Sequence, residues 1–147
     1  MYLNRARIHK ARELAEQCFT LAQSMQDTVL LQAVPQRLGS IVFFHGEIVL
    51  ARMHFEQGIP FYKAQPDHVR AVSGRMHPGV SCFSYLAWTL WLLGYLDQAL
   101  HRSCKVLTLA RASSYAYSLA VALHYAAVLC LARREARLAQ ELAEETM

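Results

Sequence analysis

Histidine and cysteine are the residues of this chain whose side chains most readily bind metals or attack substrates. The sequence has seven histidines and four cysteines. His101 and Cys104 lie three residues apart in a stretch with helical periodicity, so both side chains could contact one metal ion. A metal site needs three or four ligands, and neither an H-E-x-x-H motif nor a C-x-x-C pair occurs. We therefore expect no metal and no cofactor, and histidines that lie at the surface or at helix ends.

Two further features could support chemistry but also have a structural explanation. Cys82 is expected in the first turn of a helix, where the helix dipole can lower the pKa of a thiol; an inert, packed thiol is the alternative. Glu141, Glu144 and Glu145 form an acidic helix end, which a solvated surface explains. The sequence has no G-x-x-x-x-G-K-[ST] phosphate-binding loop. We therefore expect a protein that is not an enzyme.

The composition is that of a small domain with more apolar surface than usual. A chain of 147 residues is long enough for one domain with a buried core. Hydrophobic residues make up 54% and charged residues 18%, and the mean hydropathy is +0.15, so we expect apolar surface that the chain itself does not cover. The net charge of +4 is spread without a block of like charge, so nucleic-acid binding is not expected.

Neither a membrane nor an oxidising compartment is expected. The charged N-terminus lacks the apolar core of a signal peptide. The stretch 115–132 is nearly long enough to span a bilayer, but it contains Ser118, His124 and many alanines, so a helix buried between its neighbours is expected instead. The cysteines fall in predicted helices and are expected to be reduced, buried thiols of a cytoplasmic protein: Cys18, Cys82, Cys104 and Cys130.

Helical periodicity interrupted by glycine, proline and serine predicts an all-α fold of about seven helices. Asp27 is expected to cap the second helix, Gly46 and Gly94 to end helices in tight turns, and Pro78 to begin one. Pro35 lies inside the second helix and is expected to bend it, interrupt it or delay its start. The expected helices cover residues 4–25, 28–45, 47–61, 78–93, 96–112, 115–132 and 135–145.

The order of helix, tight turn and helix recurs in register. Gly46 and Gly94 lie 48 residues apart, and small residues precede each turn in the first helix of each pair. Alanines recur in the second helices at intervals of 40, 48 and 40 residues: Ala11, Ala51, Ala99 and Ala139. Such spacing predicts a single helical-repeat domain over residues 1–147, with a half unit (1–26) and three units (about 27–66, 78–113 and 115–147).

This register resembles the tetratricopeptide (TPR) signature, W-x2-L-G-x2-Y followed by A-x3-F. The first copy reads Pro35, Leu38, Gly39, Val42, Ala51 and Phe55. The second copy reads Phe83, Leu86, Ala87, Leu90, Ala99 and Ser103. The third copy reads Leu123, Ala126, Ala127, Cys130, Ala139 and Ala143. The resemblance implies antiparallel helix hairpins stacked as a TPR-like α-α superhelix.

The strings HPGVSCFSYLAWTLWLLGYLDQALHRS and YSLAVALHYAAVLCLARREARLAQELAEE are also similar to one group of this family. They resemble the repeat region that follows ATPase and nucleotide-cyclase modules in large bacterial signalling proteins. The chain departs from that group at His77, where an Asp is usual, and its units are longer than the family's 34 residues. The resemblance implies a regulatory or sensory region of such a protein.

The resemblance also implies a groove for a partner on the concave side of the superhelix. In each unit, the face of the first helix beside the signature residues would line this groove. Aromatic residues there suit binding of a peptide or a helix, although Trp88 and Trp91 are equally well explained as buried packing residues. The expected groove residues are Gln36, Ser40, Phe43, Ser84, Trp88, Trp91, His124, Val128 and Leu131.

The leading hypothesis is therefore a non-enzymatic scaffold that binds a protein or peptide segment. A homodimer through the terminal helices is a further expectation, because the first helix lacks a preceding partner and the last has one apolar stripe. That stripe consists of Leu138, Ala139, Leu142 and Ala143. The alternative hypothesis is a helical small-molecule-binding protein or enzyme with a pocket around Trp88 and Trp91.

Overall fold

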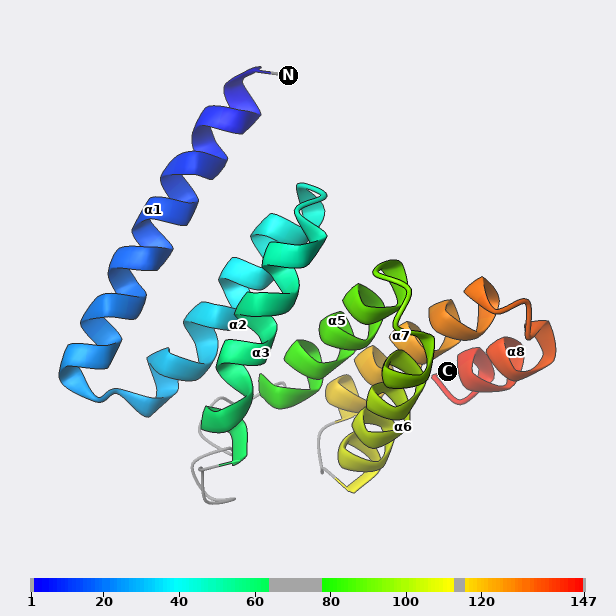
Figure 1. Ribbon diagram of the computed structural model, residues 1–147. Coiled ribbons are helices and arrows are strands. Elements are labelled where there is room, and N and C mark those ends of the chain that lie inside the picture. The colour runs from blue at the N-terminus through cyan, green and yellow to red at the C-terminus, as the bar shows by residue number, and fades with distance from the viewer. Residues whose placement is uncertain (1, 64–77, 113–115, 147) are drawn as a thin grey trace. The chain divides into compact units, whose positions relative to one another are not determined.

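The computed structural model describes residues 2–63, 78–112 and 116–146 (Figure 1). These residues form seven α-helices and no strand, which confirms the all-α fold. Each helix begins and ends within two residues of the expected position. The helices are α1 (Tyr2–Met25), α2 (Thr28–Phe44), α3 (Ile48–Lys63), α5 (Pro78–Leu92), α6 (Leu96–Ala112), α7 (Ala116–Ala132) and α8 (Ala136–Glu144).

The chain divides into two compact units, Met1–Ala64 and Gln65–Met147. In the first unit, α2 and α3 form an antiparallel hairpin, and α1 packs against α2. In the second unit, α5 pairs with α6 and α7 pairs with α8, and α7 also packs against α5 and α6. Each unit is therefore built from helix hairpins that pack on the neighbouring helix in the chain.

The same turn geometry recurs after four helices. Gln26, Gly46, Gly94 and Arg134 have positive φ angles of 52°, 82°, 84° and 63°. After α5, the amide of Tyr95 donates to the Leu90 carbonyl at 2.9 Å, and the Gly94 amide donates to the Trp91 carbonyl at 2.9 Å. The other three turns have the same pair of bonds, which is the Schellman arrangement that satisfies the last carbonyls of a helix. The turns expected at Gly46 and Gly94 are thus confirmed.

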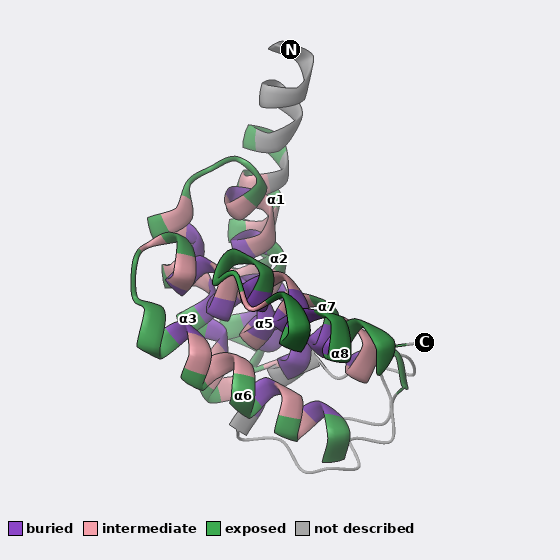
Figure 2. Cartoon of the chain, turned by 90° about the vertical axis from the view of Figure 1, so that its right-hand side faces the viewer, coloured by how far each residue is buried: buried purple, intermediate pink, exposed green. Residues whose placement is uncertain are grey.

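Small residues let the two helices of each hairpin approach closely. A methyl group on Gly39 of α2 would lie 2.5 Å from a ring carbon of Phe55 on α3, which is well inside contact distance. The equivalent residues Ala87 and Ala127 are buried, as are the alanines of the second helices, Ala51, Ala99 and Ala139. Within each unit, the buried residues lie on the sides of helices that face a neighbour (Figure 2). The expected inward-facing register is therefore present in the structure.

Pro35 neither delays nor interrupts α2, and that part of the expectation is wrong. Asp27 caps the helix by accepting hydrogen bonds from the amides of Val29 and Leu30, at 3.0 and 3.1 Å, and the helix runs on through Pro35. The proline ring is buried and lies close to Gly58 of α3.

Two hydrogen bonds connect α2 and α3 beside the proline. The Tyr62 hydroxyl donates to the main-chain oxygen of Gln32 at 2.9 Å, and the Gln32 side chain donates to the carbonyl of Phe61 at 2.8 Å. Both Gln32 and Tyr62 are buried, so these bonds are shielded from water. We infer that this packing compensates for the hydrogen bond that the proline cannot donate.

Burial differs from expectation at two cysteines and at the last helix. Cys82 and Cys130 are buried, but Cys18 and Cys104 are exposed free thiols, because no described residue covers their side of α1 and α6. On α8, Ala139 and Leu142 are buried against α7, whereas Leu138 is 44% exposed. Ala143 is also exposed, so half of the apolar stripe of α8 is covered and half is open. Among the described helices, none has both the length and the apolar character needed to cross a membrane.

His54 of α3 is a half-buried titratable group in the first unit. Its ring nitrogens are shielded from water and have no hydrogen-bond partner of good geometry. Burial lowers the pKa of His54, and the nearby Gln57 amide partly offsets that effect. Arg12 and Glu16 of α1 lie within electrostatic reach and act in opposite directions. Protonation of His54 therefore opposes the packing of the first unit.

The close contact at Gly39 generates a stability prediction. Gly39→Ala should lower the free energy of unfolding by about 1–3 kcal/mol, because the buried Phe55 ring cannot move away from the added methyl group. Gly58→Ala is the matched control, since its methyl group would meet atoms at 3.4 Å or more, and it should be neutral or stabilising by up to about 1 kcal/mol. Chemical denaturation measures both. In a Phe55→Ala background, Gly39→Ala should cost nothing, and an unchanged cost there would contradict this packing.

A second prediction concerns acid stability. His54 binds a proton less readily in the folded state than in the unfolded chain, whose ordinary pKa is 6.5. Neutral His54 therefore makes its full contribution to stability above pH 6.5. This contribution is lost as the pH falls from 6.5 through the lowered pKa of the folded state. Relative to His54→Gln, the wild-type chain should therefore lose stability between pH 7 and pH 5, measured by denaturation at each pH. His101→Gln, at an exposed position on α6, is the control. If the difference in unfolding free energy between wild type and His54→Gln does not change with pH, the prediction is wrong.

Candidate functional site

The expected groove residues of the second unit lie on two helices that pack side by side. Ser84, Trp88 and Trp91 follow one face of α5, and the residues 40 positions later follow the same face of α7, because residues four and three apart share a helix face. Tyr85 and Tyr125 connect the two helices, with ring centroids 5.0 Å apart. His124 packs edge-on against Tyr125 at 5.3 Å. The structure thus brings together the expected residues of α5 and α7.

Exposure rises toward the hairpin turn along the face of α5, whereas the face of α7 is exposed at both ends and half-buried in the middle. Ser84 is buried, Trp88, Trp91 and Val128 are half-buried, and His124 is exposed. Leu131, near the end of α7, is 59% exposed. The tryptophans are therefore neither core residues nor fully exposed, and each has area available for a partner. The helix ends nearest the turns offer the most accessible apolar area.

Leu92, the last residue of α5, extends this surface and was not among the expected residues. It is 49% exposed and follows Trp91 directly. Its repeat equivalent, Phe44, lies 48 positions earlier and is 73% exposed; the register relates the two positions, but their exposure is not visible in the sequence. We define the α5–α7 surface as Trp88, Trp91, Leu92, His124, Val128 and Leu131.

The remaining expected residues, Gln36, Ser40 and Phe43, lie on α2 in the first unit and are half-buried. The Gln36 side chain donates to the Ser40 hydroxyl at 3.2 Å, and that hydroxyl donates to the Gln36 carbonyl at 2.9 Å. Phe43 stacks edge-on against Phe44 with ring centroids 5.6 Å apart. These polar groups are satisfied within α2, and the aromatic pair forms a separate apolar feature at the end of that helix.

The α5–α7 surface is suited to apolar contact more than to catalysis. Burial, followed by a hydrogen bond with Tyr85, raises the pKa of Tyr125 far above its usual value, so this phenol stays neutral. The buried Ser84 hydroxyl has no hydrogen-bond partner, and a serine nucleophile needs an adjacent base. The surface presents uncharged, apolar groups, which come from Trp88, Trp91, Leu92, Val128 and Leu131.

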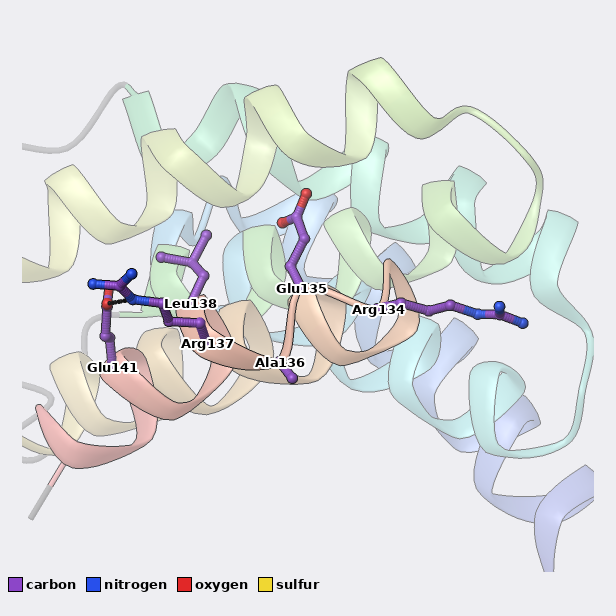
Figure 3. Close-up of a pocket in the computed structure, with 6 residues that line it drawn as sticks. All are labelled: Arg134, Glu135, Ala136, Arg137, Leu138 and Glu141. Carbon is purple, nitrogen blue, oxygen red and sulfur yellow. Dashed lines mark hydrogen bonds and ion pairs between the residues drawn. The ribbon is translucent and has the colours of Figure 1, made fainter.

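A shallow depression of about 540 Å³ lies at the turn between α7 and α8 (Figure 3). Its residues are Arg134, Glu135, Ala136, Arg137, Leu138 and Glu141. Arg137 and Glu141 face one another, with Nε and Oε1 3.1 Å apart, while Arg134 extends in the opposite direction. Glu135 pairs with Arg133 at 2.8 Å. Because most of these charges neutralise each other and neither tryptophan takes part, this depression gives no support to a pocket around Trp88 and Trp91.

Metal-binding side chains do not gather anywhere in the ranges that the structure describes. No group of three His, Cys, Asp or Glu residues there is close enough to hold an ion. His101 and Cys104 are both exposed on α6. Comparison of the chain with protein-family models, with curated proteins and with solved structures yields no match.

Proposed function

We propose that this chain is a non-enzymatic scaffold that binds a protein segment through the α5–α7 surface. The observation that carries the proposal is the cluster of half-buried and exposed apolar residues on two adjacent helices, above all Trp91, Leu92 and Leu131. Apolar patches bordered by polar residues mark interaction sites, and tryptophan is enriched among the residues that dominate binding energy.

The character of the surface defines the kind of partner. A segment with two or three large apolar side chains on one face would bury the leucines and the open edges of the tryptophans. The apolar residues of the surface carry no charge, so the affinity for the partner should depend only weakly on salt concentration. A short amphipathic helix or an apolar peptide meets these requirements.

The wider role remains a prediction from the tetratricopeptide resemblance. The buried signature register and the recurring Schellman turns support that resemblance. On this basis we propose that the chain serves in the cytoplasm as a regulatory or sensory region of a bacterial signalling protein. The partner segment would then come from a module whose activity is controlled.

Peptide selection tests the binding site. Peptides selected from a random displayed library on the intact chain should bind wild type, and Leu131→Lys should weaken them at least tenfold, which is about 1.4 kcal/mol. Leu92→Lys should have the same effect, because both changes place a charge in an apolar contact. Leu138→Lys on α8 is the control, since its leucine is similarly exposed but lies outside the surface. Fluorescence polarisation measures the affinities. Peptides that bind both surface variants as tightly as wild type would exclude this site.

A further inference from the structure

One face of α1 carries an apolar stripe that no described residue covers. Leu14, Cys18, Leu21 and Met25 are spaced by four, three and four residues, so they lie on one side of the helix. Leu14, Leu21 and Met25 are 50%, 56% and 64% exposed, and Cys18 is an exposed free thiol. We call these four residues the α1 stripe.

The α1 stripe is exposed although α1 is held in place from its other side. Ala22 is fully buried, and Ala15 and Phe19 are half-buried where α1 packs against α2. Nη1 of Arg12 lies 3.6 Å from Oε2 of Glu47, at the turn between α2 and α3. The stripe is therefore the outer face of a packed helix.

The repeat shows what covers two of these four positions elsewhere in the chain. Val106 and Leu109 of α6 lie 88 positions after Cys18 and Leu21. Val106 is buried in a cluster with Val80 of α5 and Ala122 of α7, and Leu109 packs against that cluster. Helices cover this face in the second unit, so the expected occupant of the α1 stripe is also a helix.

The stripe is complementary to itself in an antiparallel arrangement. Alternating steps of four and three residues are the spacing of a coiled-coil seam. When two copies of α1 run in opposite directions, Leu14 lies opposite Met25 of the second copy, and Cys18 lies opposite Leu21 of the second copy. A small residue then faces a large one at the centre of the seam, on both sides of a two-fold axis.

The charges of α1 favour the same arrangement. Beside the stripe, Gln17 and Ser24 are neutral, so a second copy meets no like charge there. The nearest charged residues of α1 form pairs on their own helix, including Lys10 with Glu13 at 3.2 Å. α1 has no acidic residue in its first turn and no basic residue in its last, so its dipole is uncompensated. Antiparallel pairing places Lys10 of one copy toward the negative C-terminal end of the other α1.

We propose that the α1 stripe is a dimerisation surface, occupied by the same stripe of a second copy of the chain in antiparallel orientation. Four side chains per copy make an interface far smaller than a standard one, so the dimer should be weak, with a Kd of about 10–100 µM. This proposal uses a different surface from the proposed function, and either can fail without the other.

Sedimentation velocity of the intact chain tests the proposal. The sedimentation coefficient should rise from monomer to dimer between about 5 µM and about 300 µM, a range that spans the expected Kd. Leu21→Lys should weaken the dimer at least tenfold while circular dichroism shows unchanged helix content. Met53→Lys, on the 61% exposed Met53 of α3, is the matched control and should dimerise like wild type. A wild-type chain that stays monomeric throughout, or a dimer that Met53→Lys abolishes and Leu21→Lys does not, would overturn the proposal.

Cysteine pairing tests the register. In a Cys104→Ala background, which removes the other exposed thiol, Leu21→Cys should form a disulfide between position 18 of one copy and position 21 of the other on mild oxidation. Peptide mapping by mass spectrometry identifies the linkage. Disulfides that join only position 18 to 18 and 21 to 21 would indicate parallel helices and contradict the proposed arrangement.

Discussion

The structure depends on how closely the two helices of a hairpin can approach each other. At Gly39 the α2 backbone lies so near the Phe55 ring that no side chain fits between them. At the equivalent register positions the other hairpins have small residues on both helices, Ala87 with Ser103 and Ala127 with Ala143. The large residue at one such position is thus matched by the smallest residue opposite it. What the three hairpins share at this position is a small residue on the first helix, Gly39, Ala87 or Ala127.

This contact and the Schellman turn together determine which residues face outward. The turn fixes where the second helix of a hairpin begins. The small residues allow the face of the first helix that carries them to pack against that second helix. The neighbouring face of α5 and α7 is then left open, and its apolar residues become available near the turns. The proposed binding role therefore follows from the packing rule of the hairpin, with the tryptophans serving both the packing and the surface. The stripe on α1 is a different face, equivalent to the one that holds Val106 and Leu109 on α6, and no described residue covers it.

Local rules made most of the fold predictable from the sequence. The Asp27 helix cap and the glycines at positive φ act over a few residues, the small residues of the register act within one hairpin, and the structure confirms all three. The errors concern burial that depends on distant neighbours. Cys18 and Cys104 lie in helices, but periodicity does not reveal whether another element covers them. Pro35 is tolerated because Tyr62 and Gln32, about 30 residues apart, form a hydrogen bond beside it. The sequence patterns also missed Leu92, because exposure at a helix end depends on the turn that follows.

The central claim is that one hairpin plan, with one turn, is repeated along the chain, and paired substitutions at two turns test it most directly. A methyl group on Gly94 would meet no atom within 4 Å, so Gly94→Ala reports the cost of its positive φ alone. Chemical denaturation should show Gly94→Ala to be destabilising by about 1–2 kcal/mol. Arg134→Gly, at the equivalent turn, should be stabilising by about 0.5–1 kcal/mol, because glycine adopts this conformation without strain. A neutral Gly94→Ala together with a destabilising Arg134→Gly would contradict the shared turn and the repeat that rests on it.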